Sequence, residues 1–233
     1  KGNIAVDVDS LSLYAGDCLG IVGESGCGKS TLASIIAGFE KQDSGSVIFR
    51  GEDITHYNRV QMRNVYSYMQ MIFQIPNDSF DKRYTIGSSI AEALAGTYRK
   101  KETLEYVKKL LIDVGLSEEY VCKYPDELSG GECQRAAIAR ALSRKPEILV
   151  FDDSFSALDY KTDAKLREGL NEKLKDTTKI IVAQRISTIR HADKIIVLDR
   201  GEAVGMGTHE ELMKNCDVYK EIALSQLSAA ELA

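Results

Sequence analysis

The chain has 233 residues, a formal net charge of -5, and 44% hydrophobic and 28% charged residues. These values are typical of one or two globular domains that need no disulfide or metal for stability. Because the chain is mildly acidic and has no long Lys/Arg run, we do not expect it to bind nucleic acid. No apolar run approaches the roughly 18 residues that a membrane span requires.

Short apolar runs of strand length alternate with longer helical patterns along the chain. Strands are expected at residues 19–22, 69–73, 148–151 and 179–183, and a helix at 29–39 follows the first of them. Nearly continuous apolar strands are typical of a parallel sheet that is covered on both faces. The runs 195–198 and 203–204 flank a turn and indicate a hairpin at the edge of the sheet. We therefore expect an α/β fold with a largely parallel sheet.

A block of helical patterns interrupts this α/β core. Apolar residues recur there at helical spacing, namely Leu104, Val107, Leu110, Leu111 and Val114. We expect a helical subdomain at residues 75–143, inserted between two parts of the core at 1–74 and 144–233. Towards the end of the chain, Thr208 and Glu211 have the spacing of a capping box, and a terminal helix is expected from Asp217.

The number and spacing of the cysteines indicate whether the chain works in a reducing or an oxidising compartment. The chain has five cysteines, an odd number, and they are widely spaced with no C-x-x-C pair among them. This pattern argues against a disulfide framework and against a zinc site, and it favours the reducing cytoplasm.

Residues 23–30 read GESGCGKS and match the phosphate-loop pattern G-x-x-x-x-G-K-[ST], after an expected strand and at the start of an expected helix. Its glycines let backbone N–H groups turn inward around phosphates, and the helix N-terminus adds positive potential. Lys29 is suited to reach the β- and γ-phosphates, and the Ser30 hydroxyl is suited to bind Mg²⁺. The residues expected to bind ATP here are Gly23, Glu24, Ser25, Gly26, Cys27, Gly28, Lys29, Ser30 and Thr31.

Two weaker signals accompany the phosphate loop. The strand 148–151 runs into Asp152, a carboxylate suited to hold Mg²⁺, although many strands end in Asp. Ser129 and Glu132 form an S-x-x-E cap before an Ala-rich helix, which by itself indicates only a well-capped helix. The glycine pair 130–131 leaves that helix N-terminus open as a second anion site. Two phosphate-binding helix ends and one phosphate loop favour a head-to-tail dimer with nucleotide between the subunits.

Five segments resemble, in chain order, the conserved motifs of ABC-transporter ATPases. The phosphate loop resembles the Walker A motif, Gln74 the Q-loop, and LSGGECQR at 128–135 the signature. VFDD at 150–153 resembles the Walker B motif, and SALD at 156–159 the D-loop. The resemblance implies a P-loop NTPase core that hydrolyses ATP with Mg²⁺. It also implies a second ABC ATPase domain in a homo- or heterodimer and a transmembrane transport domain, which would hold the chain at the inner face of the cell membrane.

The resemblance also assigns site residues. Ser30, Gln74 and Asp152 would bind Mg²⁺, with Gln74 also contacting the attacking water. The nucleotide of the opposite subunit would be contacted through the signature and the D-loop, by Ser129, Gly130, Gly131, Gln134 and Asp159.

Two positions depart from the family pattern. Asp153 stands where the family usually has a glutamate that polarises the attacking water, and Gln184 stands at the usual switch histidine. The shorter carboxylate sits back on the order of 1 Å, a misplacement that can cost about a hundredfold in rate. Glutamine can donate a hydrogen bond to the γ-phosphate, but it cannot carry a positive charge. With Gln74, these form the expected catalytic set, and we expect ATP to be held more readily than it is cleaved.

The two ends of the chain resemble different branches of the family. Residues 21–142 resemble oligopeptide-importer ATPases, whereas 147–228 resemble the non-consensus half of heterodimeric ABC exporters, a pattern that suits a chimera or an unusual natural member. The family's N-terminal strand with an adenine-stacking aromatic is expected to be missing, and Tyr14 is a poor substitute.

Two alternatives to a transport ATPase stay open, and a third is disfavoured. The first is a nucleotide-gated binding module that leaves hydrolysis to a partner. The second is an engineered chimeric ATPase domain with no transport role. An ABC ATPase of the chromosome-maintenance or DNA-repair kind is disfavoured, because no sustained heptads lie between Lys29 and Ser129.

Overall fold

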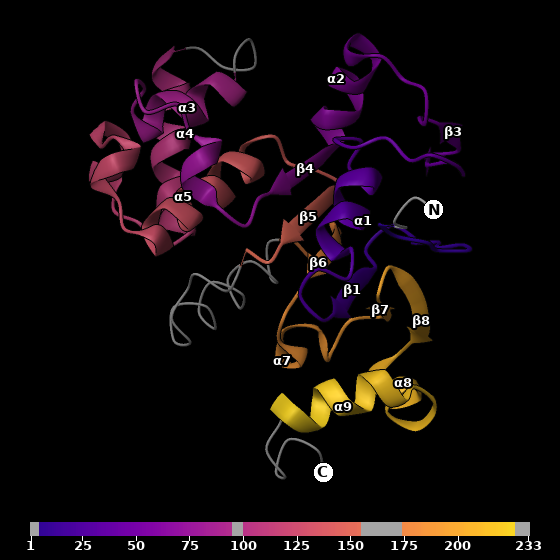
Figure 1. Cartoon of the computed structure of the whole chain (residues 1–233). Helices are drawn as coiled ribbons and strands as arrows, with labels where there is room; N and C mark the ends of the chain where they lie inside the picture. Colours follow the sequence, from indigo (N-terminus) through magenta and orange to yellow (C-terminus); the bar gives the residue numbers. More distant parts are fainter. Residues whose placement is uncertain (1–4, 95–99, 155–173, 227–233) are drawn as a thin grey trace.

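A six-stranded sheet forms the centre of the fold, in the order β4-β5-β6-β1-β7-β8 (Figure 1). The computed structural model describes residues 5–94, 100–154 and 174–226. The strands of this sheet are β1 (Cys18–Gly23), β4 (Met69–Ile72), β5 (Ile148–Asp152), β6 (Thr178–Val182), β7 (Lys194–Asp199) and β8 (Glu202–Gly207). Neighbouring strands from β4 to β7 pair in parallel, and β8 pairs antiparallel to β7 at the edge. The expected α/β fold, largely parallel sheet and edge hairpin are confirmed.

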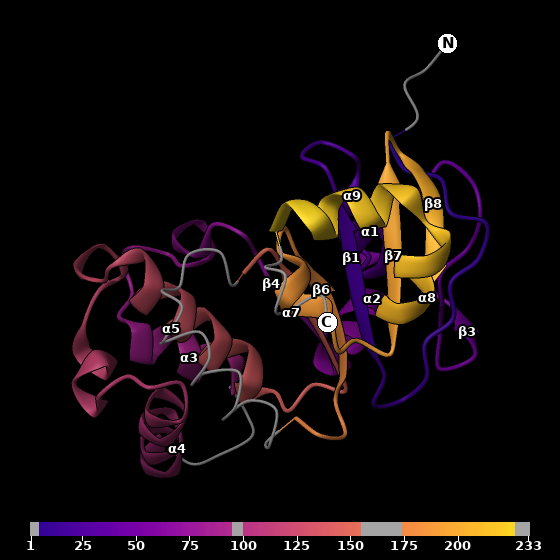
Figure 2. The ribbon, with the colours of Figure 1, turned by 90° about the horizontal axis from the view of Figure 1, so that it is seen from below.

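Helices cover both faces of this sheet (Figure 2). Successive side chains of a strand point to opposite faces, so Leu19 and Ile21 pack with α1 (Lys29–Ile36), whereas Val22 belongs to the core on the other face. On that other face lie α7 (Ile186–Ile189) and α9 (Asp217–Gln226), and α8 (His209–Asn215) precedes α9. The predicted capping box at Thr208 and the predicted terminal helix are confirmed.

The first helix ends earlier than its predicted end at residue 39. Ala37 caps α1, and Gly38 follows with φ +72°, a left-handed conformation that ends helices. The apolar pattern continues to Phe39, but that ring stacks on Tyr66 instead, with centroids 5.3 Å apart.

The helical block lies beyond β4, to one side of the sheet (Figure 1). It contains α3 (Ile86–Ala93), α4 (Lys100–Asp113), α5 (Gly130–Ser143) and 3₁₀ turns at Pro76–Ser79, Glu118–Cys122 and Pro125–Glu127. The chain enters it after β4 and returns from it into β5, and these two strands are hydrogen-bonded neighbours. Leu104 was expected in the apolar stripe of α4 but is 43% exposed. The division of the chain at 75 and 143 stays a prediction.

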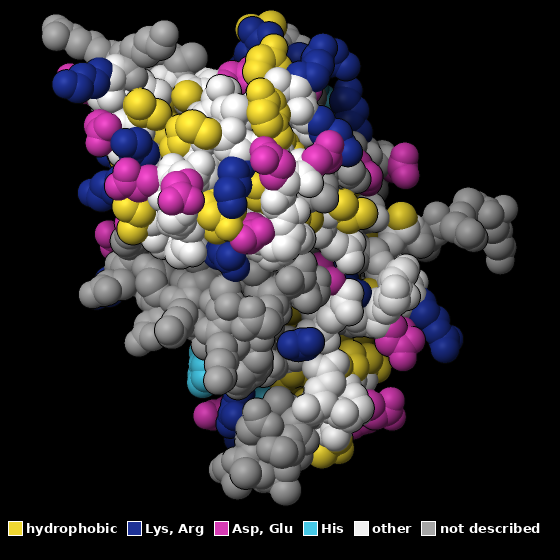
Figure 3. Space-filling model, turned by 90° about the vertical axis from the view of Figure 1, so that its left-hand side faces the viewer, with side chains coloured by type: hydrophobic (Ala, Val, Ile, Leu, Met, Phe, Trp, Pro, Cys, Tyr) yellow, Lys and Arg dark blue, Asp and Glu magenta, His cyan; other side chains and the backbone are white. Residues whose placement is uncertain are grey.

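The outer face of this block carries apolar side chains and charges of both signs, interspersed with one another (Figure 3). No helix among the described residues combines the length and the apolar character needed to cross a bilayer.

A small unit between α1 and β4 was not expected from the sequence. It consists of β2 (Ile48–Phe49), β3 (Glu52–Asp53) and α2 (Arg59–Tyr68) around Ile54, Met62 and Val65. Its strands are too short to give an alternating pattern. The start of α2 did carry a signal, because Asn58 and Gln61 form a capping box.

Candidate functional site

The carboxyl ends of four neighbouring strands, β4, β5, β6 and β1, lie side by side at one end of the sheet. In the parallel register, Ile72 of β4 lies beside Phe151 of β5, and Val182 of β6 lies between Asp152 and Ile21. The segments after these strands carry the phosphate loop, Gln74, Asp153 and Gln184. Ligands of open α/β sheets bind at this edge.

The loop from Gly23 to Gly28 has a backbone that requires glycine. Gly26 and Gly28 have φ values of +83° and +98°, and a Cβ on Gly28 would lie 2.3 Å from the carbonyl oxygen of Ala5. Gly28 is also the N-cap of α1 and supplies no side-chain cap, and no acidic residue lies in the first turn, which includes Ser30 and Thr31. The first N–H groups of a helix have no acceptor within it. This bare, uncompensated helix end fits a phosphate group.

Lys29 is buried and folds back onto the loop. Its Nζ donates to the carbonyl oxygens of Gly23 at 2.9 Å and of Glu24 at 2.7 Å. The ammonium group therefore sits at the phosphate loop, where its charge lowers the pKa values of Asp152 and Asp153, although burial raises both pKa values overall.

Ser30 and Asp152 are in direct contact. The Ser30 hydroxyl donates to Asp152 Oδ1 at 2.7 Å, and the carboxylate is buried. Burial raises the pKa of Asp152, while the Ser30 hydrogen bond and the charge of Lys29 oppose this shift. A hydroxyl and a carboxylate are the hard oxygen ligands that Mg²⁺ prefers. The donor set of this pair therefore fits Mg²⁺.

Asp153 is the point at which the expected catalytic residues meet. Asp153 is only 8% exposed, and its Oδ2 accepts hydrogen bonds from Gln74 Nε2 at 3.3 Å and from Gln184 Nε2. Burial and the adjacent Asp152 raise the pKa of Asp153. Its backbone is left-handed, with φ +46°, and its N–H donates to the Val182 carbonyl at 3.1 Å. A non-glycine residue in this conformation is strained and is held there by its surroundings.

Ser154 contributes to the site and was missed in the sequence. Its buried hydroxyl donates to the Ile72 carbonyl at 2.7 Å, which ties the end of β5 to the end of β4, two residues before Gln74. The pattern offered no signal for this contact, because it depends on which strands are neighbours.

The signature segment forms the start of α5. Ser129 caps the helix, and its N–H and hydroxyl both donate to Glu132 Oε2 at 2.8 Å. Hydrogen bonds from Tyr120 and Ser129 lower the pKa of Glu132 to about 2. A Cβ on Gly130 would meet nothing within 4 Å, so this helix end faces open space. The predicted capping box is confirmed.

Two expected site residues are not seen at the site, one because of its position and one because it is not described. Gln134 is fully buried in α5, and neither its amide nitrogen nor its amide oxygen has a hydrogen-bond partner among the described residues. The structure therefore does not bring Gln134 to the surface that carries Ser129. Asp159, with the rest of the SALD segment, lies outside the described residues. Tyr14 is 75% exposed.

The signature and the phosphate loop of the same chain are far apart. Figures 1 and 2 place α5 in the block beyond β4, whereas α1 lies against the middle of the sheet. The two helix ends that suit anions therefore do not form one site within the chain.

Comparisons with known proteins give one consistent family. The family described as "ABC transporter" matches residues 6–156. The oligopeptide transport ATP-binding protein OppF of Salmonella typhimurium is 40% identical over 91% of this chain and 65% of its own length. A putative export ATP-binding/permease protein of Rickettsia felis is 36% identical over 94% of this chain and 38% of its own length. The chain thus spans 65% of the length of the oligopeptide transport relative and little more than a third of the length of the export relative.

Two solved structures share the fold. The ATP-binding cassette MJ0796, dimeric and bound to ADP and Pi in a post-hydrolysis state, has a TM-score of 0.82 at 28% identity, over 88% of this chain and 90% of its own. A bacterial Atm1-family ABC exporter with ATP bound has a TM-score of 0.80 at 32% identity, over 95% of this chain and 39% of its own. The oligopeptide transport relative and the export relative each match nearly the whole chain, so a recombined origin stays a prediction.

Proposed function

The chain belongs to the ABC transporter family, and from that premise we propose that it is the ATP-binding domain of an ABC transport system, hydrolysing Mg-ATP slowly. In this proposal it pairs with a second ABC ATPase domain and contacts the membrane through a transmembrane transport domain. Matches to an oligopeptide transport ATP-binding protein and to a putative export ATP-binding/permease protein support a transport role.

The phosphate loop and the Ser30–Asp152 pair carry the binding part of the proposal. The bare N-terminus of α1 and the ammonium of Lys29 would hold the phosphates of ATP, and the Ser30 and Asp152 oxygens would hold Mg²⁺. Bound Mg²⁺ would neutralise charge on the β- and γ-phosphates during in-line attack by water.

The contact between Asp153 and the two glutamines is the observation that carries slow hydrolysis. In the reaction, Asp153 would orient the attacking water and accept its proton, and Gln74 and Gln184 would donate to water or phosphate oxygen. Here both amides donate to the same oxygen of Asp153. A water must compete with them for this short carboxylate, and Gln184 offers no positive charge to the γ-phosphate.

The placement of the signature supports a dimer. The open N-terminus of α5 lies in the helical block, away from the phosphate loop. Two chains arranged head to tail would bring Ser129 and Gly130 of each to the nucleotide held by the other. The dimeric form of the structural relative MJ0796 is consistent with this arrangement.

The same contact at Asp153 favours one second candidate, a nucleotide-gated module that closes on ATP and leaves hydrolysis to its partner. ATP binding and single-turnover hydrolysis by the purified chain with Mg²⁺ distinguish the candidates, with Lys29→Ala as the control. Lys29-dependent binding with slow cleavage supports the ATPase, and binding without any cleavage supports the gated module. Turnover above about 1 s⁻¹ would contradict slow hydrolysis, and absence of binding would contradict both.

A further inference from the structure

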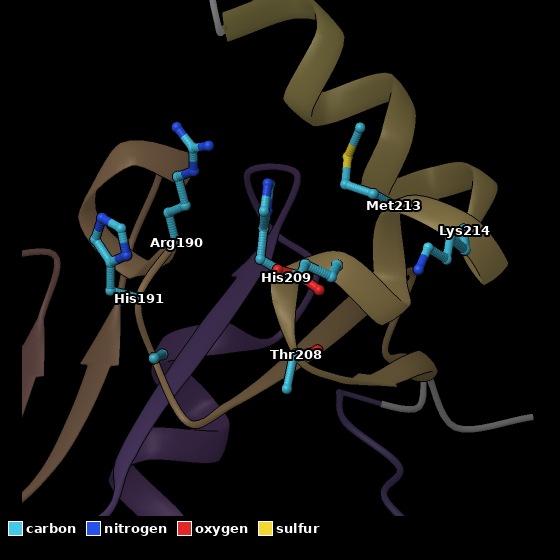
Figure 4. A pocket seen from close by; sticks show the side chains of 8 residues that line it. Arg190, His191, Thr208, His209, Met213 and Lys214 are labelled. Atoms are coloured by element: carbon cyan, nitrogen blue, oxygen red, sulfur yellow. The ribbon is translucent and has the colours of Figure 1, made fainter. Parts of the chain in front are cut away.

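A hollow of about 720 Å³ opens between the segment before β7 and the start of α8 (Figure 4). Its walls include Arg190 and His191 on one side and His209, Met213 and Lys214 on the other. The segment before β7 and the residues after β8 lie at the same end of the strands, and this is the end opposite to the carboxyl ends of β1, β5 and β6. The hollow is therefore separate from the phosphate loop.

Positive charge in this hollow is not neutralised by ion pairs. Arg190 and Lys214 are cationic side chains, and the imidazoles of His191 and His209 lie on the same wall. Among the described residues that line the hollow, Glu210 is the one carboxylate. None of the four basic residues takes part in an ion pair among the described residues. A concave cluster of like charges with so little compensation favours an anion.

His209 is held in place by a buried partner. Its Nδ1 lies 2.8 Å from the hydroxyl of Tyr219, and the two rings make an edge contact with centroids 5.6 Å apart. Burial raises the pKa of Tyr219 to about 12, so the phenol keeps its proton and can donate it to Nδ1. The imidazole then carries its own proton on Nε2 and can donate to a ligand. Figure 4 shows this ring standing between Arg190 and Met213.

The size and the lining of the hollow narrow the class of ligand. Its volume is in the range of small-molecule sites and far exceeds that of an inorganic ion. Met213 and the buried Ala192 add apolar surface to the wall. Arg190 offers a planar fork of donors that suits a tetrahedral or planar oxyanion, and Lys214 on the other side of the hollow adds a second positive charge.

We propose that this hollow binds a small organic phosphate monoester. Its phosphate is held by Arg190, Lys214 and the His209 imidazole, and its carbon skeleton lies against Met213. Such a site lies at the end of the sheet opposite to the phosphate loop.

Histidine NMR tests the site directly, because the chain contains three histidines and two of them line the hollow. Glycerol 3-phosphate is titrated into the full chain carrying Lys29→Ala, so that binding at the phosphate loop does not contribute. Single His→Gln variants assign the ring signals, and His56 is the internal reference. Inorganic phosphate, glycerol and vesicles containing phosphatidic acid are the comparison ligands.

We expect glycerol 3-phosphate to shift the signals of His191 and His209 but not that of His56. Burial, then the charges of Arg190 and His191, lower the pKa of His209, with Glu210 opposing them, so a bound dianion should raise its titration midpoint. Arg190→Gln and Lys214→Gln should each weaken binding about tenfold or more, whereas Arg63→Gln and Lys220→Gln, at residues that do not line the hollow, should not.

Four results would overturn the proposal. The first is no response at about 10 mM glycerol 3-phosphate. The second is an equal response to glycerol, which would remove the role of the charge. The third is equal affinity for inorganic phosphate, which would remove the organic part. The fourth is Arg190-dependent retention on vesicles without a response to glycerol 3-phosphate, which would assign the phosphate to a lipid headgroup instead.

Discussion

Gln184 donates a hydrogen bond from Nε2 to Oδ2 of Asp153, so the two residues at which the chain departs from the ABC ATPase pattern are in direct contact. They follow the neighbouring strands β5 and β6, whose ends are in register. Residues that share a hydrogen bond rarely act independently. The two departures therefore have to be tested together as well as singly.

Restoring the family residues should speed hydrolysis. Asp153→Glu brings the carboxylate about 1 Å closer to the attacking water, and Gln184→His supplies a group that can carry positive charge. We expect the double variant to hydrolyse ATP about 10- to 100-fold faster in a single turnover at saturating ATP. The excess over the product of the two single effects measures their coupling.

The control pair Asp126→Glu and Gln42→His makes the same chemical changes at an exposed aspartate and a partly buried glutamine, neither of which contacts Asp153, and should leave the rate unchanged. An unchanged rate in the double variant, with ATP still bound, would show that these two positions do not limit hydrolysis.

The sheet and the edge that carries the site were predictable, because buried parallel strands leave a strong apolar signature. The runs around Leu19, Val150 and Ile180 gave the strands, and the rule for parallel strands placed the segments after them together. The contact of Asp153 with Gln74 was not predictable, because it depends on the pairing of β4 with β5, and strand order has no local pattern. Gln134 belongs to the signature, as Ser129 does, yet the turn of the helix carries its side chain into the core.

Glu132 should make the fold sensitive to acid. Hydrogen bonds from Tyr120 and Ser129 hold its pKa at about 2, below the value of 4.5 of an unperturbed Glu. A carboxyl whose pKa is lowered on folding contributes stability that is full above 4.5 and is lost as the pH falls towards 2. We expect Glu132→Gln to lower the free energy of unfolding at pH 7 modestly, because this side chain is only partly buried and water screens its charge, and to flatten the pH dependence between 4.5 and 2.

Urea unfolding at a series of pH values measures both effects. Glu119→Gln, which alters a carboxylate of the nearby 3₁₀ turn at Glu118–Cys122, is the matched control and should leave the pH dependence unchanged. An equal slope in Glu132→Gln and the parent chain would contradict the assignment.

Gly28 should tolerate no side chain. Alanine there would place its Cβ 2.3 Å from the Ala5 carbonyl oxygen, at a φ of +98°. We expect Gly28→Ala to cost about 1–3 kcal/mol of stability and to weaken ATP binding at least tenfold, because the loop must move to relieve the clash. Thermal unfolding and fluorescent-nucleotide titration measure the two effects.

Gly45→Ala separates the clash from the backbone strain. Gly45 also has a positive φ, +82°, but a Cβ there would meet nothing within 4 Å. It should therefore show a smaller loss of stability and bind ATP as the parent does. Equal behaviour of the two variants would mean that the contact with Ala5 has no consequence.

The hydroxyl of Ser154 should position Gln74 against Asp153. Its hydrogen bond to the Ile72 carbonyl fixes the end of β4 relative to β5, and Gln74 lies two residues further on. Ser154→Ala should cost about 1 kcal/mol of stability and should also change the rate of ATP hydrolysis. Ser143→Ala is the matched control, because Ser143 is likewise buried and donates to a backbone carbonyl, that of Arg140 at 2.6 Å, inside α5. Both variants should lose similar stability in urea, but only Ser154→Ala should alter single-turnover hydrolysis. If the two variants retain the same rate, the hydrogen bond of Ser154 stabilises the fold without positioning the catalytic residues.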